Sequence, residues 1–299
     1  MARILAISSQ VAVGHVGLSA AVPVLQVLGH DVIALPTIVL SNHPGHAHVA
    51  GAKVPVEQLR GMLEAVRANG RLAGVNAVLT GYLPTPAHVR FAREAIDIVT
   101  AARETSDADT SEVMVVVDPV IGDAPGGLYV QPDVAEAIRD VLLAGSLAAR
   151  ARRIATPNRF ELGWLSSRPV DTQDACIAAA RTINAEVIVT SAPTHSDTDA
   201  GDTRISNLRV RSSSCGAIDG VAQELPGAAD VSHADVERLT DIPHGTGDLF
   251  AALYLGALLR GGAPLDATTD PLGFATAAAA RVVAASRGAD DLRLAATLH

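Results

Sequence analysis

The sequence predicts an α/β fold, with a mainly parallel central sheet and helices on both faces. Short β-branched runs recur along the chain, and each precedes a longer segment whose apolar residues have helical spacing. That alternation is typical of βαβ units. The clearest strand, Val113–Val117, is apolar without interruption, as expected for a parallel strand that is buried on both faces. We see no linker or internal repeat, so we expect one domain over residues 1–299.

The elements follow one another in this alternating order. Strands are expected at 3–8, 31–40, 75–80, 113–117, a segment ending at 155, and 187–190. Helices are expected at 18–28, 55–69, 86–103, 131–143, 172–184, 249–260 and 271–287, several of them closed by glycine. The pattern is weak between 195 and 240, where 203–211 is the best strand candidate.

Composition excludes several classes of protein. The net charge of −9 argues against a nucleic-acid partner and against an anionic membrane surface. No apolar run reaches transmembrane length, and no secretory signal opens the chain. The two cysteines make no disulfide framework, which favours a reducing cytoplasm. The only lysine, Lys53, lies in no Walker A motif, and no dinucleotide fingerprint follows a strand.

One stretch, His244–Leu249, has a strong chemical pattern. Gly245 and Gly247 flank Thr246, Asp248 follows, and then an apolar helix begins. Such a turn directs free N–H groups at one point, which makes an anion site suited to phosphate. Asp248 is then either a helix cap or a group that receives a proton from an attacking hydroxyl. Because a helix N-terminus stabilises a carboxylate, we expect a low pKa for Asp248.

Other polar residues follow strand ends, where parallel sheets bind ligands. Asp118 and Asp123 flank a turn and are either turn formers or a pair that holds Mg²⁺ through water. Asn158 and Glu161 are either a helix start or a pair that orients metal-bound water and triphosphate. We expect these residues to share one crevice with others at strand ends, namely Ser9, the loop containing His43, His46 and His48, Tyr82, Thr156 and Thr190. The histidine spacing fits no structural zinc pattern, so a substrate-contact loop is preferred.

With these motifs in this order, the chain resembles the ribokinase superfamily and, more narrowly, the pyridoxal kinases. The narrower resemblance rests on Ser9 with the glycines at 14 and 17, on Ser41-Asn42-His43, and on Leu79-Thr80-Gly81-Tyr82. It covers most of the chain and is poorest at 195–240.

The resemblance implies transfer of the γ-phosphoryl group of ATP to the 5′-hydroxyl of pyridoxal, pyridoxine or pyridoxamine. It implies Asp248 as the base and 245–247 as the anion hole, with Mg²⁺, a monovalent cation such as K⁺, and a homodimer. The acceptor would contact Ser9, His43, Pro44, Gly45, Tyr82 and Asp248. The nucleotide would contact Asp118, Thr156, Asn158, Glu161, Thr190, Phe250 and Tyr129, with Asp123 and Glu161 serving the metal. Residues 124–129 would form a lid.

The chain departs from the family pattern at Gln10, Leu18, Leu40 and Pro44. All but Leu18 fall in or near the expected ring pocket, so the departures bear on the acceptor rather than on phosphoryl transfer. Two alternatives therefore stay open, a hydroxymethylpyrimidine kinase and a catalytically silent vitamer-binding protein. The intact Gly-Thr-Gly-Asp motif argues against the silent protein.

Overall fold

A computed structural model of the chain describes residues 1–104, 111–194, 203–211, 230–260 and 270–297. The strands are β1 Arg3–Val11, β2 Asp31–Leu40, β3 Gly51–Lys53, β4 Val75–Thr80, β5 Val113–Val117, β6 Gly122–Asp123, β7 Gly127–Leu128, β8 Ala151–Ala155, β9 Glu186–Ala192, β10 Arg204–Val210 and β11 Val231–Glu237. The helices are α1 Leu18–Val27, α2 Val56–Ala68, α3 Pro86–Glu104, α4 Pro132–Ala137, α5 Arg159–Ser166, α6 Gln173–Ala180, α7 Thr246–Leu259, α8 Pro271–Ala285 and α9 Leu294–Thr297, and η1 Ile138–Leu143 is a π-helix.

Nine of the strands in the described part of the chain form one sheet in the order β11-β10-β9-β8-β5-β4-β1-β2-β3. The six strands from β9 to β2 run parallel, and β3, β10 and β11 are antiparallel additions at the two edges. The chain passes from β1 to β2 on one side and then returns to place β4 on the other side of β1. This reversal between β1 and β4 is where open α/β sheets bind ligands.

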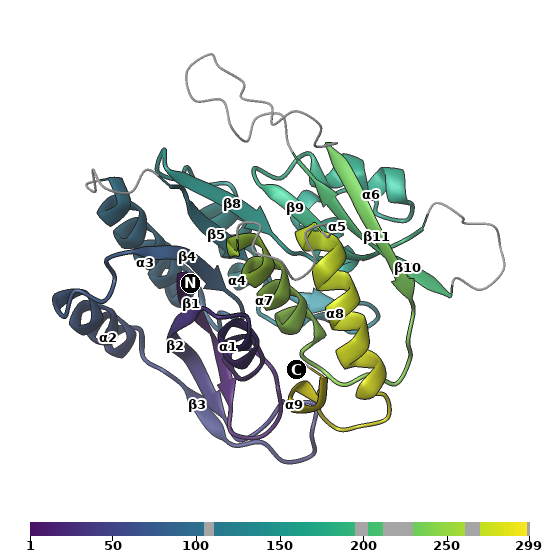
Figure 1. Cartoon of the computed structure of the whole chain (residues 1–299), viewed down its shortest axis with the longest axis horizontal. Coiled ribbons are helices and arrows are strands. Elements are labelled where there is room, and N and C mark those ends of the chain that lie inside the picture. The colour runs from purple at the N-terminus through teal and green to yellow at the C-terminus, as the bar shows by residue number, and fades with distance from the viewer. Residues whose placement is uncertain (105–110, 195–202, 212–229, 261–269, 298–299) are drawn as a thin grey trace.

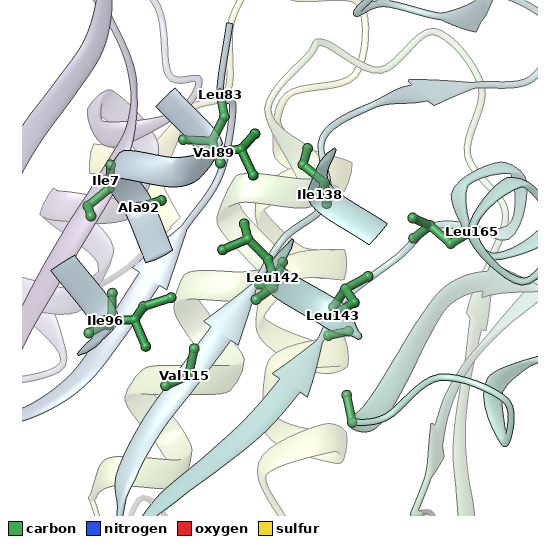
Figure 2. Packing of buried hydrophobic residues seen from close by; sticks show 14 of the residues in the cluster. Ile7, Leu83, Val89, Ala92, Ile96, Val115, Ile138, Leu142, Leu143 and Leu165 are labelled. Carbon is green, nitrogen blue, oxygen red and sulfur yellow. The ribbon is translucent and has the colours of Figure 1, made fainter. Parts of the chain in front are cut away.

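Helices cover both faces of the sheet, which confirms the predicted fold class (Figure 1). Helices α1, α7 and α8 pack on one face, against alternate residues such as Ile4, Ala6 and Leu79. The other face contacts α2, α3, α4, η1, α5 and α6 through the intervening residues, such as Leu5 and Ile7. Figure 2 shows part of this second core, in which Ile7 and Val115 of the sheet lie near the α3 and η1 side chains. Neighbouring residues of one strand thus serve two cores.

Several elements differ from the prediction. The expected helix at 131–143 changes from α4 to a π-helix, in which the Ala144 N–H bonds to the Arg139 carbonyl at 2.8 Å. The glycine-rich segment after β5 carries a small hairpin, β6–β7, and neither β3 nor α9 was anticipated. The glycines expected to close α7, at 261 and 262, lie outside the described residues. Within the described residues, no helix combines the length and the apolar character that crossing a bilayer requires.

A buried ion cluster joins strands at the amino-terminal end of the parallel sheet, away from the strand ends expected to bind ligands. Glu186, the first residue of β9, is paired with Arg152, with Arg211 at 3.2 Å and with Arg209 at 3.6 Å. It also accepts a hydrogen bond from the Tyr254 hydroxyl of α7 at 2.8 Å. Burial alone would raise the pKa of Glu186, but Arg152 and its other partners lower it overall. Glu186 therefore links β8, β9, β10 and α7 at this end of the sheet, and we assign it a structural role.

Candidate active site

The amino end of α7 is shaped by a glycine that no other residue could replace without strain. Gly245 precedes the helix with φ 96°, in the left-handed region. A side chain at this position would also collide with the backbone carbonyl of His15. The loop before α1 and the turn before α7 therefore touch. The first turn of α7 leaves N–H groups without partners in the helix, as the anion-site prediction requires.

Asp248 lies in that first turn and is held from the opposite loop. The Gly17 N–H donates a hydrogen bond to its carboxylate. Gly17 has φ 55°, and a side chain there would run into the backbone and hydroxyl of Ser9. The end of β1, the start of α1 and the start of α7 thus meet around Asp248. Ser9 and Asp248, predicted to share one site, are brought together here.

The expected low pKa of Asp248 is wrong. Burial raises the pKa of its carboxyl group from 3.8 to about 6, and the bond from Gly17 opposes that change only in part. The sequence argument considered the helix end, which favours the anion, without the loss of water around it. A carboxyl group with a pKa near neutrality is a better proton acceptor than the one first expected.

A small cavity of about 10 Å³ lies beside Asp248, between the sheet and helices α1 and α7. This volume is close to that of one water molecule. Its walls are formed by Ala6, Ser8, Gly17, Leu18, Ala21, Leu79, Thr80, Gly81, Asp118, Asp248 and Ala251. The Thr80 hydroxyl is buried there and has no hydrogen-bond partner in the described part of the molecule. The cavity coincides with the β1/β4 reversal of the sheet.

Asp118 is a second carboxylate in this cavity. It follows β5, is buried, and accepts a hydrogen bond from the Thr156 hydroxyl at 3.0 Å. Burial raises its pKa well above the ordinary range, and the neighbouring carboxylates of Asp248 and Glu161 raise it further. The structure thus couples Asp118 to Asp248 and Glu161, whereas the sequence suggested a pair with Asp123. A methyl group on Gly247 would lie 4.0 Å from Asp118 Oδ2, so Asp118 lies behind the turn at the start of α7.

Glu161 forms a capping box with Asn158 at the start of α5. The Asn158 side chain accepts the Glu161 N–H at 2.9 Å, and Glu161 Oε2 accepts the Asn158 N–H at 2.8 Å. Glu161 Oε1 accepts the N–H groups of Ile121 at 3.0 Å and Gly122 at 3.5 Å. Burial raises the pKa of Glu161 to about 8, although the bonds from the N–H groups of Asn158, Ile121 and Gly122 favour the anion. The helix-start alternative is therefore realised, and both oxygens are already engaged.

The hairpin β6–β7 extends from this clamped segment. The Asn158 amide donates to the Gly122 carbonyl at 2.8 Å, which fixes the root of the hairpin a second time. Beyond the root, the Tyr129 hydroxyl bonds to Asp123, and burial with that acidic neighbour raises the Tyr129 pKa. Tyr129 is nevertheless 52% exposed. Asp123 and Tyr129 thus form a pair on the segment expected to act as a lid.

Residues expected to hold the acceptor come from two neighbouring strand ends. The Tyr82 N–H donates to Ser8 Oγ at 3.0 Å, and the Tyr82 carbonyl accepts from Thr37 Oγ1 of β2 at 2.8 Å. His43, Pro44 and Gly45 lie in the loop between β2 and β3. The sequence argument missed Ser8, which joins β1 to Tyr82. Its place one residue before Ser9, at the end of a buried strand, was the available signal.

Thr190 and Phe250, both expected near the nucleotide, have surroundings that differ from each other. Thr190 is joined to the start of α5, because its N–H donates to the Pro157 carbonyl at 2.9 Å. Phe250 is only 4% exposed and packs in the core between α7, α1 and the sheet. It has almost no surface to offer a ligand, so we leave it out of the candidate site.

The expected metal ligands do not form a closed protein cage. In the described part of the chain, no group of three or more His, Cys, Asp or Glu side chains is arranged to hold a metal ion. Glu161 already uses both oxygens for backbone N–H groups, which leaves Asp123 of the expected pair. Mg²⁺ in phosphate-handling sites commonly keeps several waters and binds phosphate oxygens with one or two carboxylates. The residues present fit that open mode and not an all-protein site.

Fold and site together define a kinase of the ribokinase-like type, with an acid behind a glycine turn at a helix N-terminus and further carboxylates at the strand ends. The chain belongs to the phosphomethylpyrimidine kinase family, whose model matches residues 17–292.

Relatives and solved structures agree with this assignment. The chain is 36% identical over 261 residues to a pyridoxine/pyridoxal/pyridoxamine kinase of Bordetella bronchiseptica, covering 86% of this chain and 81% of that protein. A pyridoxal kinase of Corynebacterium diphtheriae is 29% identical over 263 residues, covering 86% and 81% of the two chains. The structure of Leishmania donovani pyridoxal kinase with ADP and pyridoxine superposes with a TM-score of 0.79 at 27% identity, covering 99% of this chain and 93% of that one.

Proposed function

We propose that this protein transfers the γ-phosphoryl group of ATP to the 5′-hydroxyl of pyridoxal, pyridoxine or pyridoxamine. The observation that carries the proposal is Asp248, a carboxylate with a pKa of about 6 placed directly behind the glycine turn of α7. A carboxylate in that place can take the hydroxyl proton while the N–H groups of the turn stabilise charge on the phosphoryl oxygens. The vitamer kinases among the relatives support the choice of acceptor.

The other residues then take two roles. The acceptor ring lies among Ser9, Tyr82 and the loop of His43, Pro44 and Gly45. The triphosphate lies toward 245–247 and the strand ends that carry Asp118, Thr156, Asn158 and Thr190, with Tyr129 over it. Residues 124–129 close over both substrates and exclude water from the transfer.

Cations enter this proposal with the nucleotide. Burial raises the pKa of the carboxyl groups of Asp118, Asp248 and Glu161, and within the described residues none of them is ion-paired with a lysine or arginine. These residues supply no cation to offset the charge of a triphosphate, so Mg²⁺ would accompany ATP, with Asp123 nearby and Glu161 holding the surrounding backbone. When bound, Mg²⁺ would offset the charge of the phosphate oxygens. A monovalent cation such as K⁺ would reduce the remaining charge. We also propose a homodimer, as the family resemblance implies. The absence of a linker or repeat supports a single domain over 1–299, and the cysteine content supports a cytoplasmic location.

The deciding experiment supplies purified protein with ATP, Mg²⁺ and one acceptor at a time. Pyridoxal, pyridoxine, pyridoxamine and hydroxymethylpyrimidine are compared, with the phosphorylated product identified by mass. Phosphorylated vitamers formed by the wild type and lost in Asp248→Asn are the expected result. Turnover of hydroxymethylpyrimidine alone would move the assignment to that substrate. Vitamer binding without ATP consumption would identify a silent binding protein.

A further inference from the structure

Two histidines from distant parts of the chain stack beside the candidate site. His43 lies in the loop between β2 and β3, and His244 immediately precedes Gly245. Their ring centroids are 3.8 Å apart and their planes are inclined by 21°. The stack therefore joins the loop expected to contact the acceptor to the turn expected to bind phosphate.

The loop backbone is folded against the same pair. The Gly45 N–H donates a hydrogen bond to His43 Nδ1 at 3.1 Å, so this nitrogen carries no proton in the observed arrangement. A methyl group on Gly45 would lie 3.0 Å from His43 Nδ1 and 3.2 Å from His244 Nε2. The contact thus involves three residues, and it requires His43 to be neutral.

The charges around His43 mostly disfavour its protonation. Burial first, and then the nearby imidazoles of His244 and His46, lower the pKa of His43 to about 4, while Asp291 acts in the opposite direction. Asp291 comes from the segment after α8 and lies against Gly14 of the loop before α1. Two imidazolium rings stacked this closely would repel each other.

We propose that His244 is a positioning residue for the acceptor: it stacks on His43 and holds the 41–48 loop against the phosphate-binding turn while the His43 ring is neutral. This inference deepens the proposed function, because it assigns a residue outside the expected set to acceptor binding. His244 acts through His43 and touches no reacting atom.

The pH dependence follows from the two states of the loop. When the loop is released, His43 has its ordinary pKa of 6.5, and when the loop is docked that pKa is about 4. The released state therefore binds more protons between these values. Docking is fully stable above about pH 6.5 and weakens as the pH falls toward 4.

The test uses His244→Ala, which removes the stack, and His244→Phe, which keeps an aromatic ring without charge. Val49→Ala is the matched control, since Val49 is an exposed residue at the end of the same loop. NMR follows the titration of the His43 ring without substrates, hydrogen exchange follows the amides of 41–48, and steady-state kinetics gives KM for pyridoxal and for ATP. We expect His244→Ala to raise KM for pyridoxal by about 2- to 12-fold, the range for one stacked aromatic pair, with KM for ATP and kcat nearly constant.

The remaining expectations separate this inference from the proposed function. In His244→Ala the His43 pKa should rise toward 6.5 and loop amides should exchange faster, whereas Val49→Ala should match the wild type. His244→Phe should retain the wild-type KM for pyridoxal at about pH 8. As the pH falls to about 6, it should lose less affinity for pyridoxal than the wild type does. An unchanged His43 titration in His244→Ala, or an unchanged KM for pyridoxal, would overturn the positioning role. If the wild type does not phosphorylate pyridoxal, the proposed function fails, and titration and exchange still decide whether His244 holds the loop.

Discussion

Replacing Asp248 with asparagine separates its chemistry from its packing. Asparagine has nearly the same shape, and its side-chain carbonyl can still accept the hydrogen bond that Gly17 donates to Asp248. The substitution removes the negative charge and the ability to take a proton. A large change in rate with little change in structure is therefore the expected pattern.

The structure also predicts the effect of this substitution on stability. The pKa of Asp248 rises from 3.8 in the unfolded chain to about 6 in the folded protein, so the folded state binds more protons between these values. Stability is therefore lost as the pH rises through this window, and above it the ionised group destabilises the fold by up to about 3 kcal/mol. This figure is an upper bound because the residue retains some exposure. Asp248→Asn should accordingly be more stable than the wild type above about pH 6 and equal to it below about pH 4.

Two measurements check this reasoning. Urea unfolding at several pH values gives the stability difference, with Asp290→Asn, a change at an exposed aspartate, as the control. Initial rates with pyridoxal and ATP should show kcat lower by about 10²- to 10⁴-fold in Asp248→Asn, with both KM values nearly unchanged. In the wild type, kcat/KM for the acceptor should fall as the pH drops through about 6. A variant with normal kcat would refute the role of base, and a variant less stable than the wild type above about pH 6 would refute the buried-charge argument.

Other substitutions test the surroundings of the site. Glu186→Gln should lower the free energy of unfolding by about 3–5 kcal/mol, because three guanidinium groups lose their buried partner, and urea unfolding measures this. The Glu186 contribution should be present above its ordinary pKa of 4.5 and lost as the pH falls through the lowered folded value. Gly245→Ala should reduce kcat/KM for ATP and acceptor at least about tenfold, since its methyl group displaces the turn from the His15 carbonyl; unaltered kinetics would contradict the phosphate-binding turn. Glu161→Gln should destabilise the fold by about 1–3 kcal/mol, because its amide cannot accept every N–H that the carboxylate accepts, and faster exchange at residues 121 and 122 is the direct readout.

Regular elements were predictable because their residues carry strong local signals. The strands ending at Thr80, Val117 and Ala155 end where the sequence argument placed them, since buried parallel strands are continuous apolar runs followed by polar turns. The short edge strand β3 and the hairpin β6–β7 were missed, because two or three exposed or glycine residues carry no period.

The sequence indicated several residues that the structure brings together at the candidate site, but it did not indicate their contacts. Strand ends identified Asp118, and the glycine turn identified Asp248, because backbone geometry restricts those positions. The coupling between them depends on three-dimensional burial, which also reversed the expected pKa of Asp248. The stack of His43 on His244 joins positions far apart in the chain and leaves no local pattern.

The five hydrogen bonds that Glu161 and Asn158 make to 121–122 and to each other's backbone have a mechanical consequence. They fix the direction in which the chain leaves the sheet after β5, because they hold residues 121–122 against the start of α5. Any swing of the hairpin must therefore arise from rotations beyond Gly122, where Gly126 and Gly127 lie. Under the proposed function, changes in the length or composition of the tip would alter how far it reaches over the substrates and leave Asp118, Asp248 and Glu161 undisturbed. The reach of the hairpin and the chemistry proposed for Asp248 can thus vary independently in this fold.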